Sequence, residues 1–134
     1  MQNVEEIIAR DIAYPPDFGS PTSLAMRAGD TLYISGMIAW DAERRIVGRA
    51  DPREQTRQAL ENMRKILRAA GADFDRIMKI TFYLTDIRDK AAVWDERKAL
   101  FGDSRPASTL VEVSHLVDPL ALLEIDAVAY LGPR

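Results

Sequence analysis

A sharply bounded amphipathic helix in the middle of the chain most constrains what this sequence can fold into. Asp51 can cap the helix, Pro52 suits its first position, and Gly71 is a typical stop. Apolar residues recur at helical spacing and predict one buried stripe: Ala59, Met63, Ile66, Leu67 and Ala70. The helix predicted over residues 52–70 therefore needs an apolar surface, which the segments on either side must supply.

The remaining apolar segments of the chain predict one more helix and four strands. The second helix is expected over Asp89–Phe101, with Gly102 ending it. The strands are expected at residues 31–38, 77–84, 110–113 and 122–131. The order of these elements predicts an α+β fold, in which two helices cover one face of a mixed sheet.

Two helices are too few to cover both faces of a broad sheet, and this bears on assembly. The chain has 134 residues, a size suited to one domain, and we expect a single domain over residues 1–134. The sheet face opposite the helices must then meet solvent or another protein surface. Oligomerisation is the expected answer, since a symmetric oligomer buries the same surface on every copy.

Charge and composition argue against several classes of function. The net charge of −3 disfavours a surface for nucleic acid or for anionic membranes. There is no cysteine and only one histidine, and the acidic residues show no metal-ligand spacing, so no metal is expected. Met1–Arg10 lacks the apolar centre of a signal peptide, and no apolar run is long enough to span a membrane. A cytoplasmic protein is the default expectation.

The C-terminal third of the chain carries a recognisable pattern. Residues 106–116 (PASTLVEVSHL) and 123–129 (LEIDAVA) resemble the signature segments of the RidA family, also called YjgF/UK114 or endoribonuclease L-PSP. The strand segment 32–36 (LYISG) and the helix segment 55–71 are similar to that family too. The resemblance implies a chorismate-mutase-like (RidA/YjgF-like) α+β fold and a homotrimer with small-molecule clefts between subunits. It also implies an enamine/imine deaminase that needs no metal or organic cofactor.

The chain departs from the family pattern at a position that matters for substrate binding. In the family, the arginine of a Pro-Ala-Arg triplet holds the substrate carboxylate through two parallel hydrogen bonds. The triplet here is Pro106-Ala107-Ser108, so Ser108 stands where the arginine is expected. Arg105 is the candidate substitute; in the alternative, it is an exposed loop arginine or forms an ion pair with Asp103 or with a neighbouring subunit.

The other half of the family site is present. Glu124 matches the glutamate that handles the attacking water and is the candidate catalytic residue; in the alternative, it faces the polar environment of its own subunit or pairs with an arginine across the trimer. The candidate substrate-binding residues are Ser35, Gly36, Arg105, Ser108 and Thr109. Gly36 can also serve packing alone, because a glycine inside a strand marks either a bulge or a close approach to the backbone.

Three functions compete for this sequence. The leading hypothesis is an enamine/imine deaminase-type hydrolase that releases ammonia from a small reactive metabolite, aminomuconate-like rather than 2-aminoacrylate. The alternative is a non-catalytic trimer that binds a small molecule as a sensor or regulator, and the missing arginine supports it. Endoribonuclease activity is disfavoured by the acidic charge and the absence of a basic, aromatic stripe. The sequence leaves open whether the chain is an enzyme.

Overall fold

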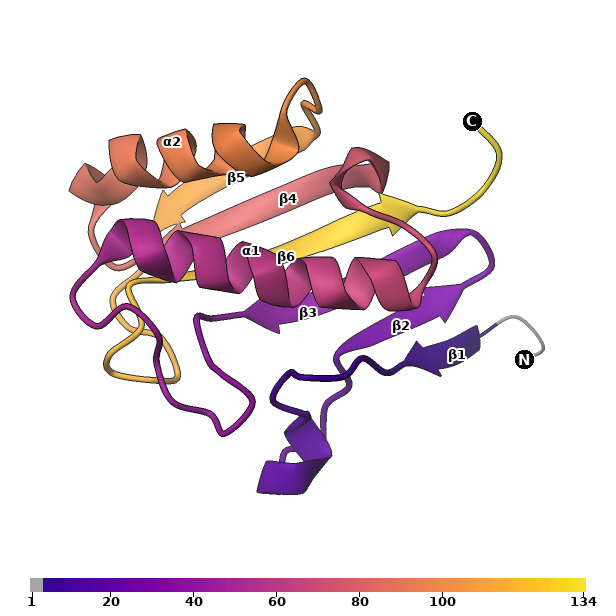
Figure 1. The fold of residues 1–134 in the computed structure, drawn as a ribbon, viewed down its shortest axis with the longest axis horizontal. Helices are drawn as coiled ribbons and strands as arrows, with labels where there is room; N and C mark the ends of the chain where they lie inside the picture. The colour runs from indigo at the N-terminus through magenta and orange to yellow at the C-terminus, as the bar shows by residue number, and fades with distance from the viewer. Residues whose placement is uncertain (1–3) are drawn as a thin grey trace.

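A six-stranded mixed sheet forms the body of the protein, which the computed structural model describes over residues 4–134 (Figure 1). Its strands are β1 (Val4–Ile7), β2 (Ala25–Ala28), β3 (Thr31–Met37), β4 (Ile77–Leu84), β5 (Ala107–Glu112) and β6 (Leu123–Tyr130). Their spatial order is β1-β2-β3-β6-β4-β5, with β4 and β5 parallel and the other neighbours antiparallel. Residues 1–3, at the start of the segment Met1–Arg10, lie outside the described residues.

Two helices, α1 (Pro52–Ala69) and α2 (Lys90–Phe101), lie side by side on one face of the sheet (Figure 1). α1 begins where predicted because the Asp51 side chain accepts hydrogen bonds from two backbone N–H groups of the first turn. It ends before Gly71, whose φ of 78° is one that glycine adopts without strain. This arrangement confirms the predicted α+β fold, a mixed sheet with two helices on one face.

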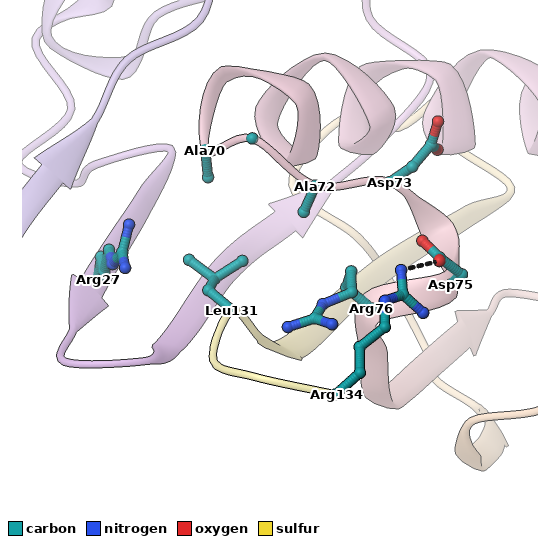
Figure 2. A pocket seen from close by; sticks show the side chains of 9 residues that line it. Arg27, Ala70, Ala72, Asp73, Asp75, Arg76, Leu131 and Arg134 are labelled. Carbon is teal, nitrogen blue, oxygen red and sulfur yellow. Dashed lines mark hydrogen bonds and ion pairs between the residues drawn. The ribbon is translucent and has the colours of Figure 1, made fainter.

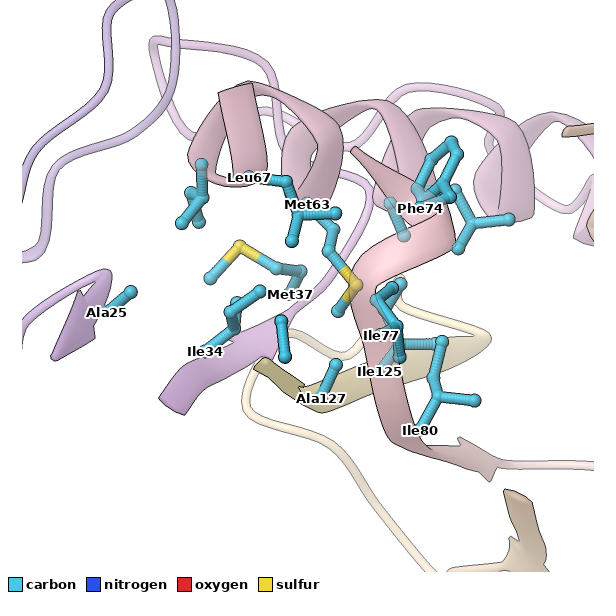
Figure 3. Packing of buried hydrophobic residues seen from close by; sticks show 14 of the residues in the cluster. Ala25, Ile34, Met37, Met63, Leu67, Phe74, Ile77, Ile80, Ile125 and Ala127 are labelled. Carbon is cyan, nitrogen blue, oxygen red and sulfur yellow. The ribbon is translucent and has the colours of Figure 1, made fainter. Parts of the chain in front are cut away.

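The hydrophobic core lies between the helices and the sheet (Figure 3). The predicted stripe of α1 is buried at Ala59, Met63, Ile66 and Leu67, and Ala70 lies partly buried beside it. The inward-facing residues of the central strands pack against this stripe: Ile34, Ile80, Phe82, Leu84, Leu123, Ile125 and Ala127. Truncating one such large side chain to alanine typically costs about 2–5 kcal/mol, so this layer fixes the positions of β3, β4 and β6.

Some elements differ from the sequence-based expectation. The sequence does not predict β1 and β2, because each has only four residues and carries charged side chains that obscure the alternation. β5 begins three residues earlier than expected, at Ala107, where its pairing with Lys79 of β4 starts. Short 3-10 turns connect the larger elements: η1 (Pro15–Phe18), η2 (Phe74–Arg76) and η3 (Ile87–Asp89). Among residues 4–134, no helix has the length and apolar character that crossing a membrane requires.

The sheet face opposite the helices, here called the bare face, exposes several large apolar side chains. Met26, Tyr33 and Val128 lie side by side across β2, β3 and β6, and Val111 lies beside Tyr83 on β5 and β4. Met26 is 37% exposed, Tyr33 53% and Val111 39%. An apolar surface of this kind commonly marks an interaction site, which agrees with the expectation that the bare face meets another protein surface.

Candidate functional site

A β-bulge places the candidate catalytic residue at the edge of the bare face. Two residues of β3, Ser35 and Gly36, face the single β6 residue Asp126. Glu124 lies on the same face of β6 as Asp126, because the residues between and beside them point into the core. The bulge therefore brings Ser35, Gly36 and Glu124 together, as the sequence-based hypothesis requires of a shared site.

Gly36 gives the carboxylate of Glu124 room to lie almost on the backbone of β3. A Cβ atom at position 36 would stand 2.3 Å from Oε2 of Glu124, well inside any normal contact distance. Both predicted reasons for a glycine apply here, since position 36 is part of a bulge and is closely approached. The approaching group is the Glu124 side chain, so Gly36 sets where that carboxylate can lie.

Glu124, Ser35 and Gly36 line one cleft of about 520 Å³, here called the Glu124 cleft. Its walls come mainly from the N-terminal loop, the end of β3 and the loop that follows: Ile12, Ala13, Pro15, Phe18, Ser20, Thr22, Leu24, Met37, Ile38, Trp40 and Arg44. Asn62 of α1 and Val117 of the loop before β6 complete the lining. The buried Asn62 amide donates hydrogen bonds to the carbonyls of Ile38 and Trp40, which holds this loop against α1. The cleft is thus mostly apolar, with a few polar groups near Glu124.

The surroundings of the Glu124 carboxylate raise its pKa. Burial raises its pKa above the ordinary value for a glutamate, and the nearby negative charge of Asp126 raises it further. Glu124 forms no hydrogen bond or ion pair with any side chain in residues 4–134, and the alternative of a pair with an arginine across the trimer stays a prediction. Asp126, by contrast, accepts a hydrogen bond of 3.0 Å from the Tyr83 hydroxyl. A partnerless acid with a raised pKa in a cleft is a characteristic feature of an active site.

Arg105 and Ser108 line a different cavity of about 350 Å³, between α2 and the start of β5. Ser108 faces the helix side of the sheet, since its β4 neighbour Ile80 points into the core. Its hydroxyl accepts a hydrogen bond of 2.8 Å from Nη1 of Arg97 in α2. Arg105 is exposed at the rim and forms no ion pair with Asp103. We call this space the Arg97 cavity.

Thr109 lies in a third place, on the bare face. It is the neighbour of Thr81 across β4 and β5, and its hydroxyl accepts a hydrogen bond of 2.8 Å from Nζ of Lys79. The structure thus brings together Ser35, Gly36 and Glu124 but separates them from Arg105, Ser108 and Thr109 within one chain. The roles of all six residues in substrate binding and catalysis stay predictions.

Arg97 is a candidate that the sequence-based reasoning missed. The sequence places it within the second predicted helix and gives no link to Ser108. One signal was available: a serine in place of an expected arginine directs attention to arginines on the neighbouring element. Arg97 lies one helical turn after Trp94 and one turn before Phe101, so helical spacing places all three on one face of the helix.

A third cavity, of about 490 Å³, lies where α1 ends and the C-terminal segment passes (Figure 2). Its charged groups largely satisfy one another. Arg134 pairs with Asp75, and Asp73 accepts hydrogen bonds from Arg64 and Arg68. No group of three or more potential metal ligands occurs among residues 4–134. The Glu124 cleft and the Arg97 cavity are therefore the better candidates, because each presents a charged group without an oppositely charged partner.

The mixed sheet, the two helices on one face and the cleft around a partnerless carboxylate define a small α+β protein with the features of a ligand-binding site. The sequence model of the family described as endoribonuclease L-PSP matches residues 16–131, and the chain belongs to this family. The predicted RidA/YjgF/UK114 resemblance is thereby confirmed.

Relatives of known name lie within the same family. A RutC family protein of Pyrococcus horikoshii is 40% identical over 127 residues, which cover 95% of this chain and 98% of the relative. The human 2-iminobutanoate/2-iminopropanoate deaminase is 37% identical over 121 residues, 90% of this chain and 88% of the human protein. The structure of Escherichia coli TdcF with bound serine superposes with a TM-score of 0.84 at 28% identity, covering 94% of this chain and 98% of TdcF.

Proposed function

We propose that this chain is an imine deaminase, a hydrolase that releases ammonia from the imine of a small carboxylic acid. The observation that carries the proposal is the Glu124 carboxylate, which is partly buried in the cleft, has a raised pKa and has no side-chain partner among the described residues 4–134. Relatives named as 2-iminobutanoate/2-iminopropanoate deaminases, at 37% and 38% identity, give the class of reaction.

Glu124 can perform the proton transfers that imine hydrolysis requires. A water molecule adds its oxygen to the imine carbon while Glu124 accepts one proton from that water. The nitrogen takes up a proton from solvent, which regains one when the hydroxyl later loses its proton, and the intermediate carries hydroxyl and amino groups on one carbon. Glu124 then passes a proton to the nitrogen, the C–N bond breaks, and the hydroxyl loses its proton. Imine and water become a carbonyl compound and ammonia, and Glu124 returns to its starting state.

The proposed enzyme acts as a homotrimer with its ligand at the interface between copies. Glu124 and Ser108 lie on opposite faces of one sheet, so one chain cannot present both to a single small molecule. A second copy packed on the exposed apolar side chains of the bare face could complete the site. Light scattering should give a mass of about 45 kDa, three times the 15.1 kDa of the chain. A stable monomer at micromolar concentration would contradict this assembly.

The competing function is a trimer that binds a metabolite without converting it, and Ser108 favours it. A serine hydroxyl cannot replace the two charged hydrogen bonds of an arginine. The two functions separate in an assay of ammonia release from 2-iminobutanoate formed in situ and from an aminomuconate-like imine. The hydrolase predicts turnover of at least one imine. Binding of a 2-oxoacid without turnover of any imine in this panel would instead establish the binding protein.

A further inference from the structure

Arg97 holds its charge in an unusual place, among aromatic rings beneath α2. Its guanidinium carbon lies 4.9 Å from the ring centre of Trp94, 5.2 Å from that of Phe82 and 5.4 Å from that of Phe101. These rings attract a cation through their faces. They also exclude water, and burial lowers the pKa of the Arg97 guanidinium below its usual value.

No carboxylate in residues 4–134 pairs with this guanidinium. The two acidic residues that precede it in α2 are already engaged by α1: Asp95 pairs with Arg53, and Glu96 pairs with Arg57. The single hydrogen bond of Arg97 within residues 4–134 runs from Nη1 to the Ser108 hydroxyl. The edge formed by Nε and Nη2, which suits two parallel hydrogen bonds to a carboxylate, therefore has no protein acceptor there.

The surroundings of Arg97 add positive charge and no negative charge. Lys98 and Arg105 line the same cavity, and none of its other lining residues is acidic: Trp94, Phe101, Gly102, Ser104, Pro106 and Ser108. A partly buried cation is costly unless it is paired. A cavity that gathers three cations around an unpaired guanidinium edge is suited to an anion.

We propose that Arg97 binds the carboxylate of the substrate, in place of the arginine that is missing at position 108. This inference rests on the proposed deaminase function and names the anchor of its substrate. Ser108 is a positioning residue, since its hydroxyl holds Nη1 and leaves the Nε–Nη2 edge without a protein acceptor among residues 4–134. The same contact gives a reason for the serine at position 108, because an arginine there would bring a second positive charge against Arg97.

The test is calorimetric binding of 2-oxobutanoate, the carbonyl product expected from 2-iminobutanoate, to the full chain. Arg97→Met keeps the bulk of the side chain and should weaken binding at least about thirtyfold, as is typical of losing a buried charged hydrogen bond. Arg97→Lys keeps the charge but not the planar group that donates two parallel hydrogen bonds, and we expect an intermediate loss of affinity. Arg57→Lys, which alters an arginine paired with Glu96, is the matched control and should bind like wild type.

Three results would overturn the inference. They are no binding of 2-oxobutanoate by wild type, equal binding by wild type and by both Arg97 variants, or loss of binding in Arg105→Gln but not in Arg97→Met. Thermal melting verifies the fold of each variant, and Ser108→Ala, which leaves Arg97 in place, should weaken binding by less than Arg97→Met does.

Ammonia release separates the two proposals. If ammonia is released but the binding of 2-oxobutanoate does not depend on Arg97, only the anchor role of Arg97 is refuted. If binding depends on Arg97 but no ammonia is released, only the deaminase function is refuted.

Discussion

The Glu124 cleft and the Arg97 cavity differ in the charge that each leaves without a partner. The cleft at the bulge holds an acid whose pKa is raised by burial, and the cavity under α2 holds a guanidinium whose pKa is lowered by burial. Elsewhere on the surface, charged groups pair readily, as Arg88 does with Asp86 and Arg64 with Asp73.

The difference between the two spaces teaches how the work of a site can be divided. Proton transfer to and from water needs an acid whose pKa lies near the working pH, and holding a carboxylate needs a fixed cation. Within one chain these groups would neutralise each other if they met directly. Here they lie on opposite sides of the sheet, so each keeps its charge available, and in the proposed trimer a second copy would bring the two spaces together.

The largest expected effect comes from removing the acid of the Glu124 cleft. Glu124→Gln keeps the size of the side chain but cannot accept the proton, so turnover should fall by roughly 10²–10⁴-fold. Binding of 2-oxobutanoate should stay within about tenfold of wild type, because the proposed anchor is elsewhere. Glu61→Gln, an acid of α1 that lines neither space, is the control. Turnover by Glu124→Gln at the wild-type rate would remove Glu124 from the mechanism.

A somewhat smaller effect is expected from displacing that acid without changing it. Gly36→Ala places a Cβ where Oε2 of Glu124 now lies, so the carboxylate must move away. A displacement of about 1 Å can cost roughly 10²-fold in turnover. Steady-state kinetics should show a lower kcat with an unchanged far-ultraviolet circular dichroism spectrum. A Gly36→Ala protein with normal kcat would show that the position of the carboxylate is not critical.

The charge next to Glu124 should set the pH dependence of turnover. Glu124 must be ionised to accept a proton, so activity should rise with pH through its raised pKa. Asp126→Asn removes the negative charge that contributes to this rise and leaves an acceptor for Tyr83, so the midpoint of the rise should move to lower pH. Asp75→Asn, which breaks the pair with Arg134, should leave the midpoint in place. A midpoint that stays or moves upward in Asp126→Asn would contradict the assignment.

The smallest expected effect concerns stability. A carboxyl group whose pKa is raised on folding destabilises the folded state once it ionises, and this penalty is complete above the folded pKa. Glu124→Gln should therefore melt at a higher temperature than wild type at pH 8. The difference should shrink as pH falls through the raised pKa toward the unfolded value. Melting curves at several pH values measure it, and a difference that grows toward low pH has the wrong sign.

The fold was largely predictable because its strongest elements carry local signals. Asp51 and Gly71 bound α1, and alternation identifies β4 and β6. The sequence does not predict β1 and β2, because these strands gain their stability from pairing at the sheet edge rather than from a hydrophobic pattern of their own. Tertiary pairing also sets the start of β5 at Ala107, which the sequence placed three residues later.

The site was predictable only in part, for a different reason. The resemblance located Glu124, Ser35 and Gly36, which the bulge does bring together. It directed attention to Arg105 because that residue is near Ser108 in the chain. The hydrogen bond to Ser108 comes instead from Arg97, eleven residues away on α2. A contact between a helix and a strand depends on packing, and no spacing rule within one element reveals it.

The central claim is that Glu124 of one copy and Arg97 of another serve the same substrate. Its most direct test is to co-express Glu124→Gln and Arg97→Met chains under separate tags and to purify the mixed trimers. Each variant alone lacks a complete site, but every mixed trimer should hold one complete site out of three, about one third of the sites, because each site needs one intact residue from each neighbour. Ammonia release well above that of both single variants is the predicted result. Mixed trimers no more active than the single variants would contradict it.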